Sequence, residues 1–190
     1  MTILATFTRL VKRLRRSEHG VAAVEFALIL PVMLTAYVGS LEASALITMD
    51  RKIQSVSSSV GDLVAQSNVT LAKDTFIDFL RAAGGIMSPY RDNNLQQSVV
   101  QVAVAANGTT KVVWSWDFKN DTLTVGTKYP KDSSFSLPAE MIDISRGSNV
   151  IVAEASNAYR PLYGIIIESE INLRRQSFYL PRFGGSITIK

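Results

Sequence analysis

The chain has 190 residues, a length that is enough for one ordinary domain and an additional anchor. Its formal net charge is +4. The excess charge lies in residues 1–20, where five basic residues face one acidic residue; fifteen basic and fifteen acidic residues follow from position 21 onward. A nucleic-acid-binding surface needs a basic patch in the folded domain itself, and the balanced body shows none, so we expect no nucleic-acid partner.

The chain has no cysteine, and its one histidine is His19. A mature form that begins after Gly20 would therefore contain neither residue type. Ser-His and Cys-His nucleophilic sites, disulfides and metal sites built on thiolate or imidazole ligands are then excluded. We expect a protein that is not an enzyme and that carries no cofactor or metal.

An apolar segment from Val21 to Leu41 follows the basic leader, and its one charged residue is Glu25. As a helix these residues would rise about 31 Å, close to the ~30 Å hydrocarbon core of a bilayer. The basic cluster before the segment predicts that the N-terminus stays in the cytoplasm. We therefore expect residues 21–41 to span a membrane and residues 42–190 to be exported.

Three interpretations of this segment compete. In the first, the segment is a cleaved secretory signal, and Ala43-Ser-Ala45 is a matching cleavage site. In the second, it is an uncleaved signal anchor. In the third, it follows a leader that is cut on the cytoplasmic side, before the apolar run. The third interpretation gives both Gly20 and Glu25 a role. Cleavage after Gly20 creates a positive amino group on Val21, one helical turn from Glu25. A carboxylate in a transmembrane helix is costly and usually has a partner.

In a bundle of staggered helices, the amine of one subunit can meet Glu25 of its neighbour. Desolvation offsets much of the gain from such an ion pair. Its main effect would be to fix the axial register between subunits.

The segment Gly20-Val-Ala-Ala-Val-Glu25-Phe26-Ala-Leu-Ile-Leu-Pro31 resembles the TadE/TadG-type pseudopilins of the Tad (tight adherence) pilus, a type IVc pilus system. The resemblance implies cleavage between Gly20 and Val21 by a prepilin peptidase. It makes Glu25, followed by Phe26, the assembly residue that sets register. Pro31 would loosen the helix where subunits pack, because proline removes one hydrogen bond.

The resemblance further implies a single-pass inner-membrane protein that joins the pilus or cell surface after processing. Its partners would be the prepilin peptidase, other Tad pilins and pseudopilins, the inner-membrane pilus assembly platform and the membrane. The sizeable body indicates a minor pilin. Weaker similarity covers Asn149–Pro161 and Phe178–Arg182, but Asn157 stands where many relatives have an aromatic residue, which leaves TadE-, TadF- and TadG-like subtypes open.

The body predicts an α+β, pilin-like fold: a long N-terminal helix, transmembrane and then amphipathic, packed on a C-terminal antiparallel sheet. Five apolar residues at three- and four-residue steps predict the packing stripe: Ile53, Val56, Val60, Leu63 and Val64. A second helix is expected over residues 71–83, with Thr70 as its N-cap and Gly84-Gly85 at its end. Strands are expected at 97–105, 109–118, 149–159 and 170–179, with a two-residue turn at Asn107-Gly108.

Two features allow a different function but favour a structural role. Trp114 and Trp116, expected on one strand face with Val112 and Phe118, would serve a membrane-anchored or secreted periplasmic binding or adhesion domain; covering a helix is the commoner use. The residues Asp117, Asn120 and Asp121 could suggest a calcium loop but lack the EF-hand spacing, and Asp74/Asp78 and Glu168/Glu170 could each form a carboxylate pair. We interpret them as solvated side chains.

Overall fold

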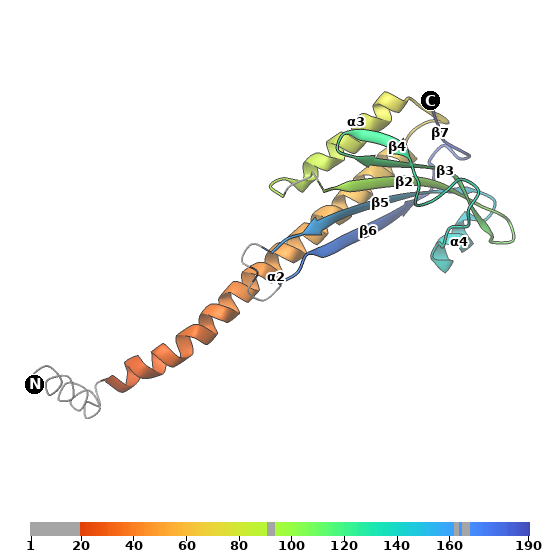
Figure 1. Ribbon diagram of the computed structural model, residues 1–190. Coiled ribbons are helices and arrows are strands. Elements are labelled where there is room, and N and C mark those ends of the chain that lie inside the picture. Colours follow the sequence, from red (N-terminus) through yellow and green to blue (C-terminus); the bar gives the residue numbers. More distant parts are fainter. Residues whose placement is uncertain (1–19, 91–93, 162–163, 165–167) are drawn as a thin grey trace, which may run out of the picture. The chain divides into compact units, whose positions relative to one another are not determined.

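The computed structural model describes residues 20–90, 94–161, 164 and 168–190 (Figure 1). The predicted leader, including Arg15, Arg16 and His19, lies outside the described residues except for Gly20. The expected α+β architecture is confirmed: the long helix α2 (Val21–Ala65) precedes an antiparallel sheet of five strands. The chain divides into two compact units, residues 1–44 with 162–168 and residues 45–161 with 169–190.

In the first unit, α2 presents side chains to the outside on all its faces. Every residue from Val21 to Tyr37 is exposed, although nearly all of them are apolar. Within the described part of the chain, α2 is the one helix that is long and apolar enough to cross a membrane. The helix continues through Pro31, and the Thr35 hydroxyl donates to the Pro31 carbonyl at 2.8 Å.

In the second unit, α2 becomes one-sided. Met49, Ile53, Val56, Val60 and Val64 are each at most 3% exposed and recur at three- and four-residue steps. This spacing places them on one helix face, which packs on the sheet. The predicted stripe is therefore confirmed, except that Leu63 is only partly buried.

The helix α2 packs tightly on the sheet at Gly61. A Cβ atom at this position would lie 2.6 Å from Tyr179 Cδ2 and 3.2 Å from Ala153 Cβ, so a glycine is needed there. Ser57 is buried as well, and its hydroxyl lies 2.9 Å from the Ser177 hydroxyl. Small side chains on both surfaces let the helix approach the strands.

The five strands lie in the order β4-β3-β2-β5-β6, and each neighbouring pair is antiparallel. Their bounds are β2 Gln96–Val104, β3 Thr110–Lys119, β4 Thr122–Val125, β5 Asn149–Tyr159 and β6 Ile171–Tyr179. Four of these strands match the predicted ones closely, and β4 is a short additional strand after β3. The turn lies at Asn107-Gly108 as predicted, but Ala105 N–H donates to the Thr109 carbonyl, which makes it a three-residue loop.

A β-bulge corrects the expected faces of β3. Gln101 pairs with Trp114 and Val102 pairs with Val112, so β3 holds one extra residue, Val113, between them. Neighbouring residues of β2 point to opposite faces, and therefore Val112 and Trp114 do as well. The prediction that both share a face was wrong.

Two layers cover the sheet on opposite sides. The second half of α2 and the helix α3 (Lys73–Gly84) lie on one face (Figure 1). On the other face, residues 126–138 and the short helix α4 (Ala139–Ser145), which we did not predict, cover a second apolar cluster. Its buried members are Val100, Val102, Val104, Val112, Phe135, Leu137, Val150 and Val152.

Residues near the C-terminus replace the predicted cap of α3. Thr70 belongs to the two-residue strand β1 (Thr70–Leu71), which pairs in parallel with β7 (Thr188–Ile189), so its predicted N-cap role was wrong. The N-cap position of α3 is Ala72, whose side chain makes no capping bond. Lys73 N–H donates instead to the Lys190 carbonyl at 2.6 Å. The helix ends at Gly84 as predicted, and a 3₁₀ turn, η2 (Gly85–Met87), follows it.

The two tryptophans lie partly buried on the helix-bearing face. Trp114 Nε1 donates to the Ile187 carbonyl at 2.7 Å, and Lys73 Nζ lies 5.4 Å from the ring centroid of Trp116. Gln101, fully buried beside Trp114 on this face, accepts from Ile187 N–H and donates to the Ser186 hydroxyl. Trp114 therefore contacts the C-terminal segment, and Trp116 contacts α3 through Lys73.

We expect Gly61→Val to lower the free energy of unfolding by about 1–3 kcal/mol, because the added methyl groups would force α2 away from Tyr179. Thermal and denaturant unfolding of the full chain would measure the change. Gly85→Ala is the matched control, since a Cβ there meets nothing within 4 Å. Equal stability of Gly61→Val and the unchanged chain would contradict the close packing.

Candidate functional site

The predicted processing and assembly residues lie at the start of α2. Gly20 directly precedes the helix, and a Cβ built on it would meet nothing within 4 Å. Val21 is the first helical residue and is 53% exposed; Phe26 is 59% exposed, and Glu25 is exposed as well. Glu25 lies four positions after Val21, so the two residues lie on the same helix face, one turn apart. This face combines a carboxylate with an apolar surround.

A shallow apolar groove lies on the same helix. It has a volume of about 590 Å³, and its lining consists of Pro31, Val32, Thr35, Ala36 and Gly39. Small side chains at a helix surface let a second helix approach closely. The structure therefore places Pro31 beside a surface suited to helix packing, while the processing residues lie two to three turns earlier.

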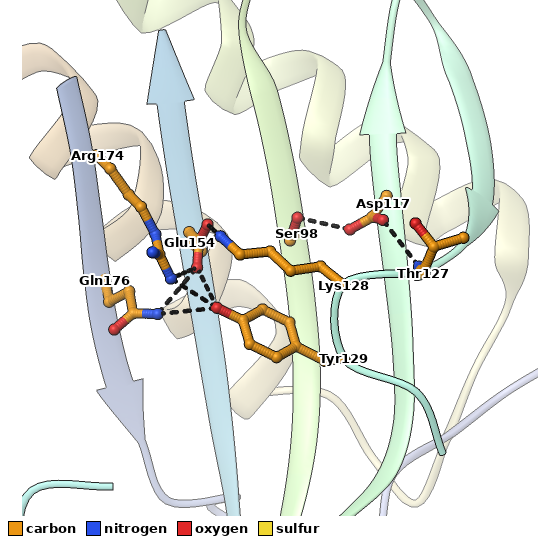
Figure 2. Close-up of polar contacts among 8 residues, drawn as sticks. All are labelled: Ser98, Asp117, Thr127, Lys128, Tyr129, Glu154, Arg174 and Gln176. Carbon is orange, nitrogen blue, oxygen red and sulfur yellow. Dashed lines mark hydrogen bonds and ion pairs between the residues drawn. The ribbon is translucent and has the colours of Figure 1, made fainter. Parts of the chain in front are cut away.

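The second compact unit contains a polar centre around Glu154 on β5 (Figure 2). Glu154 is 5% exposed and accepts hydrogen bonds from four side chains. The donors and their distances are Lys128 Nζ at 2.6 Å, Arg174 Nη2 at 2.6 Å, the Tyr129 hydroxyl at 2.8 Å and Gln176 Nε2 at 2.9 Å.

The donors to Glu154 come from two different elements. Lys128 and Tyr129 belong to the segment that crosses the sheet after β4, and Arg174 and Gln176 belong to β6. Asp117 on β3 also bonds this segment, because it accepts a hydrogen bond from Thr127 N–H at 3.3 Å (Figure 2). It accepts a second one from the Ser98 hydroxyl of β2 at 2.6 Å. Together these carboxylates hold the crossing segment on the sheet.

The electrostatics of Glu154 follow from its burial and its donors. Burial alone would raise its pKa, but hydrogen bonds from Arg174, Lys128, Gln176 and Tyr129 outweigh burial and lower the pKa. Burial, together with the negative charge of Glu154, raises the pKa of Tyr129 to about 12. A carboxylate with four donors is a poor general base, so this centre stabilises the fold rather than performing chemistry.

Other acidic groups from the sequence do not form a metal site. Asp121 pairs with Arg81 at 2.5 Å, whereas Asp117 accepts hydrogen bonds from Ser98 and Thr127, so the two carboxylates have separate partners. No group of three or more histidine, cysteine or acidic residues is placed to hold a metal ion within the part of the chain that the structure describes.

The Glu154 centre was missed from the sequence. One signal for it was present: a glutamate in the middle of the otherwise apolar run from Val150 to Ala155 must find donors when the strand is buried. The identity of those donors depends on the pairing of β5 with β6, which places Gln176 directly opposite Glu154.

Comparison with known families gave one match: the family model for TadE-like proteins matches residues 20–61. The matched segment begins at Gly20 and includes Glu25, Phe26, Pro31 and the buried stripe of α2 as far as Gly61. Comparisons with curated proteins and with solved structures found no match. The resemblance to TadE-like proteins is thus confirmed for the first part of the chain, while the weaker C-terminal similarity stays a prediction.

The lowered pKa of Glu154 makes stability depend on pH. The ionised form of Glu154 is favoured in the folded state, so Glu154 stabilises the fold at pH values above the pKa that it has in the unfolded chain. This stabilisation is lost as pH falls through the pKa that Glu154 has in the folded chain. We expect Glu154→Gln to lower the free energy of unfolding at pH 7 by about 1–3 kcal/mol. This difference from the unchanged chain should shrink as pH falls below the ordinary glutamate range.

Denaturant unfolding at a series of pH values would measure this difference. Glu170→Gln, which removes an exposed ion pair with Arg160, is the control and should cost under about 1 kcal/mol. A Glu154→Gln difference that is absent at pH 7, or that stays constant into acid, would contradict the role of the charge.

Proposed function

We propose that this chain is a minor pilin or pseudopilin of a Tad-type pilus, cut by a prepilin peptidase between Gly20 and Val21. The observation that carries the proposal is the TadE-like match, which begins at Gly20 and extends along α2. The family is a structural one, and we propose that this chain likewise serves assembly rather than catalysis.

The exposure of α2 supports an assembly role. Seventeen consecutive residues from Val21 to Tyr37 are exposed, and most are apolar. Such a surface is stable only in lipid or against other apolar helices. We propose that the helix first spans the inner membrane, with its N-terminus in the cytoplasm, and later packs among the helices of other Tad pilins and pseudopilins.

Glu25 would then give each subunit its axial position. After cleavage, the new amino group of Val21 is a cation at the start of a helix whose next turn carries Glu25. The amine of one subunit and Glu25 of the next can pair in a low-dielectric surround, where an unpaired carboxylate is costly. An offset of one turn would leave both charges unpaired, and this penalty selects a single register.

Pro31 and the groove beside it support the same arrangement. The groove is apolar and its lining includes Thr35 and Gly39, one helical turn apart, so a neighbouring helix can approach closely. We propose that this surface contacts another subunit or the inner-membrane assembly platform. The exported α+β unit would remain outside the helix bundle and contribute to adhesion at the pilus or cell surface.

Glu25→Ala separates processing from assembly. We expect the leader to be removed nearly as efficiently as in the unchanged chain, because the cut lies at Gly20. Incorporation into sheared pili should fall at least about tenfold, which corresponds to a loss of ~1.4 kcal/mol of pairing free energy. Immunoblots of membrane and sheared surface fractions, with leader removal read from the mass shift, would measure both quantities.

Two further variants act as controls. Glu25→Gln keeps the side-chain shape and should lose incorporation as Glu25→Ala does, because it lacks the charge. Gly20→Ile should block leader removal itself. Normal pilus incorporation of Glu25→Ala would contradict the register argument.

A further inference from the structure

A surface groove crosses the sheet on the face that carries the Glu154 centre. Its volume is about 520 Å³, within the about 300–1,000 Å³ that is usual for small-molecule sites. Ser156, which lines it, follows Glu154 by two residues on β5, so the two side chains lie on the same face of the sheet. The groove spans four strands, β3, β2, β5 and β6, and its polar side chains include Gln96, Lys119, Ser156, Asn172 and Arg174.

The register of the sheet places four of these residues in one row. Gln96 pairs with Lys119 on one side and with Ser156 on the other. Ser156 in turn pairs with Arg174, and paired residues of neighbouring strands point to the same face. Because neighbouring strands lie about 4.8 Å apart, the row from Lys119 to Arg174 is about 14 Å long. Asn172, two residues before Arg174 on β6, lies beside this row on the same face.

The side chains of this row are available for binding, unlike those of the row next to it. In the neighbouring row, Glu154 and Asp117 accept hydrogen bonds from Lys128 and Thr127, which belong to the segment that crosses the sheet (Figure 2). Four side chains of the groove have no hydrogen-bond or ion-pair partner among the described residues, namely Gln96, Lys119, Ser156 and Asn172.

The charge of the groove is positive. Its described lining holds three cations, Lys119, Arg160 and Arg174, against the single carboxylate of Glu170. Glu170 pairs with Arg160, and Arg174 shares the Glu154 carboxylate with a second cation. Lys119 therefore stays unneutralised at one end of the row, and the cations at the other end exceed the carboxylate that they share. A complementary ligand is an anion.

The lining also indicates which kind of anion fits. An extended ligand matches a row of about 14 Å, whereas a single phosphate does not. The Gln96 and Asn172 amides and the Ser156 hydroxyl can both donate and accept hydrogen bonds, as sugar hydroxyls do. Carboxylates attached to the sugar rings would meet Lys119 and Arg174, which form the stronger, charge-assisted bonds.

An acidic peptide matches this groove less well. Peptides that bind to a sheet use the free backbone groups of an edge strand, whereas the groove runs across β2 and β5, which are interior strands. The apolar residues of its described lining are Ala158 and Leu173, which offer no deep pocket for a peptide side chain.

We propose that this groove binds an acidic oligosaccharide. The sugar hydroxyls bond to Gln96, Ser156 and Asn172, and the carboxylates pair with Lys119 and Arg174. Such binding names a ligand class for the adhesion role proposed above, and its use in the cell rests on that role. Binding itself requires neither the removal of the leader nor Glu25.

The test compares three ligands of equal length. Tetramers of galacturonic acid, glucose and glutamate are titrated separately into the ¹⁵N-labelled full chain in detergent micelles, at an ionic strength of about 0.15 M. The Gln96 and Asn172 side-chain amide signals are followed. We expect saturable shifts with the galacturonic acid tetramer. The glucose tetramer lacks the carboxylates and the glutamate tetramer lacks the hydroxyls, so each should bind at least about tenfold more weakly.

Two lysine variants on β3 form a matched pair. Lys119→Ala removes a cation from the groove, and the affinity for the galacturonic acid tetramer should fall about tenfold, the effect of one hydrogen bond to a charged group. Lys111→Ala removes the same charge at the opposite end of β3, where Lys111 pairs with Asp132 at 3.0 Å. Its affinity should stay within about twofold of that of the unchanged chain, since both lysines are exposed and only one lines the groove. Circular dichroism would confirm that both variants keep the fold.

Three results would overturn the proposal: no saturable binding of the galacturonic acid tetramer, equal affinity for either of the other tetramers, or equal effects of Lys119→Ala and Lys111→Ala. If a variant does not fold, the comparison of the three tetramers on the unchanged chain decides. Because the purified chain is used, a negative result leaves the pilus proposal standing. Conversely, normal incorporation of Glu25→Ala would contradict the register argument and leave this site unaffected.

Discussion

The structure depends on a single helix that must suit two environments. The first part of α2 exposes apolar side chains on every face, whereas the part from Met49 to Val64 hides one apolar stripe against the sheet. At Gly61 the helix lies so close to the sheet that Tyr179 and Ala153 leave no room for a side chain. The position of the sheet on the helix follows from this contact, because larger residues there would separate the two layers.

Polar side chains hold the remaining segments on this framework. On one face, Glu154 fixes the segment that follows β4; on the other face, Gln101 binds the backbone and hydroxyl of the C-terminal segment. Both side chains are buried and fully engaged, so each acts as a specific anchor rather than as a reactive group. These anchors tie the segment after β4 and the C-terminal segment to the sheet.

Local patterns predicted the elements of the fold but not the contacts between distant segments. The helix stripe from Ile53 to Val64 and the alternation in four strands were sufficient to indicate α+β. The role of Thr70 was mistaken because pairing with Thr188, more than a hundred residues away, competes with helix capping. The bulge at Val113 reversed the expected face of Val112, since one inserted residue changes the alternation. The TadE-like segment was recognisable because its residues are adjacent, whereas the donors to Glu154 are dispersed.

We propose that the chain is cut before its apolar helix, and the identity of the mature N-terminus distinguishes this cleavage from its alternatives. Intact mass and N-terminal sequencing would be carried out on protein from cells with an active Tad system and from cells that lack its prepilin peptidase. We expect a protein that begins at Val21 in cells with an active Tad system and a protein that retains its leader in cells without the peptidase. A start at Leu46, or an intact leader in cells that contain the peptidase, would contradict it.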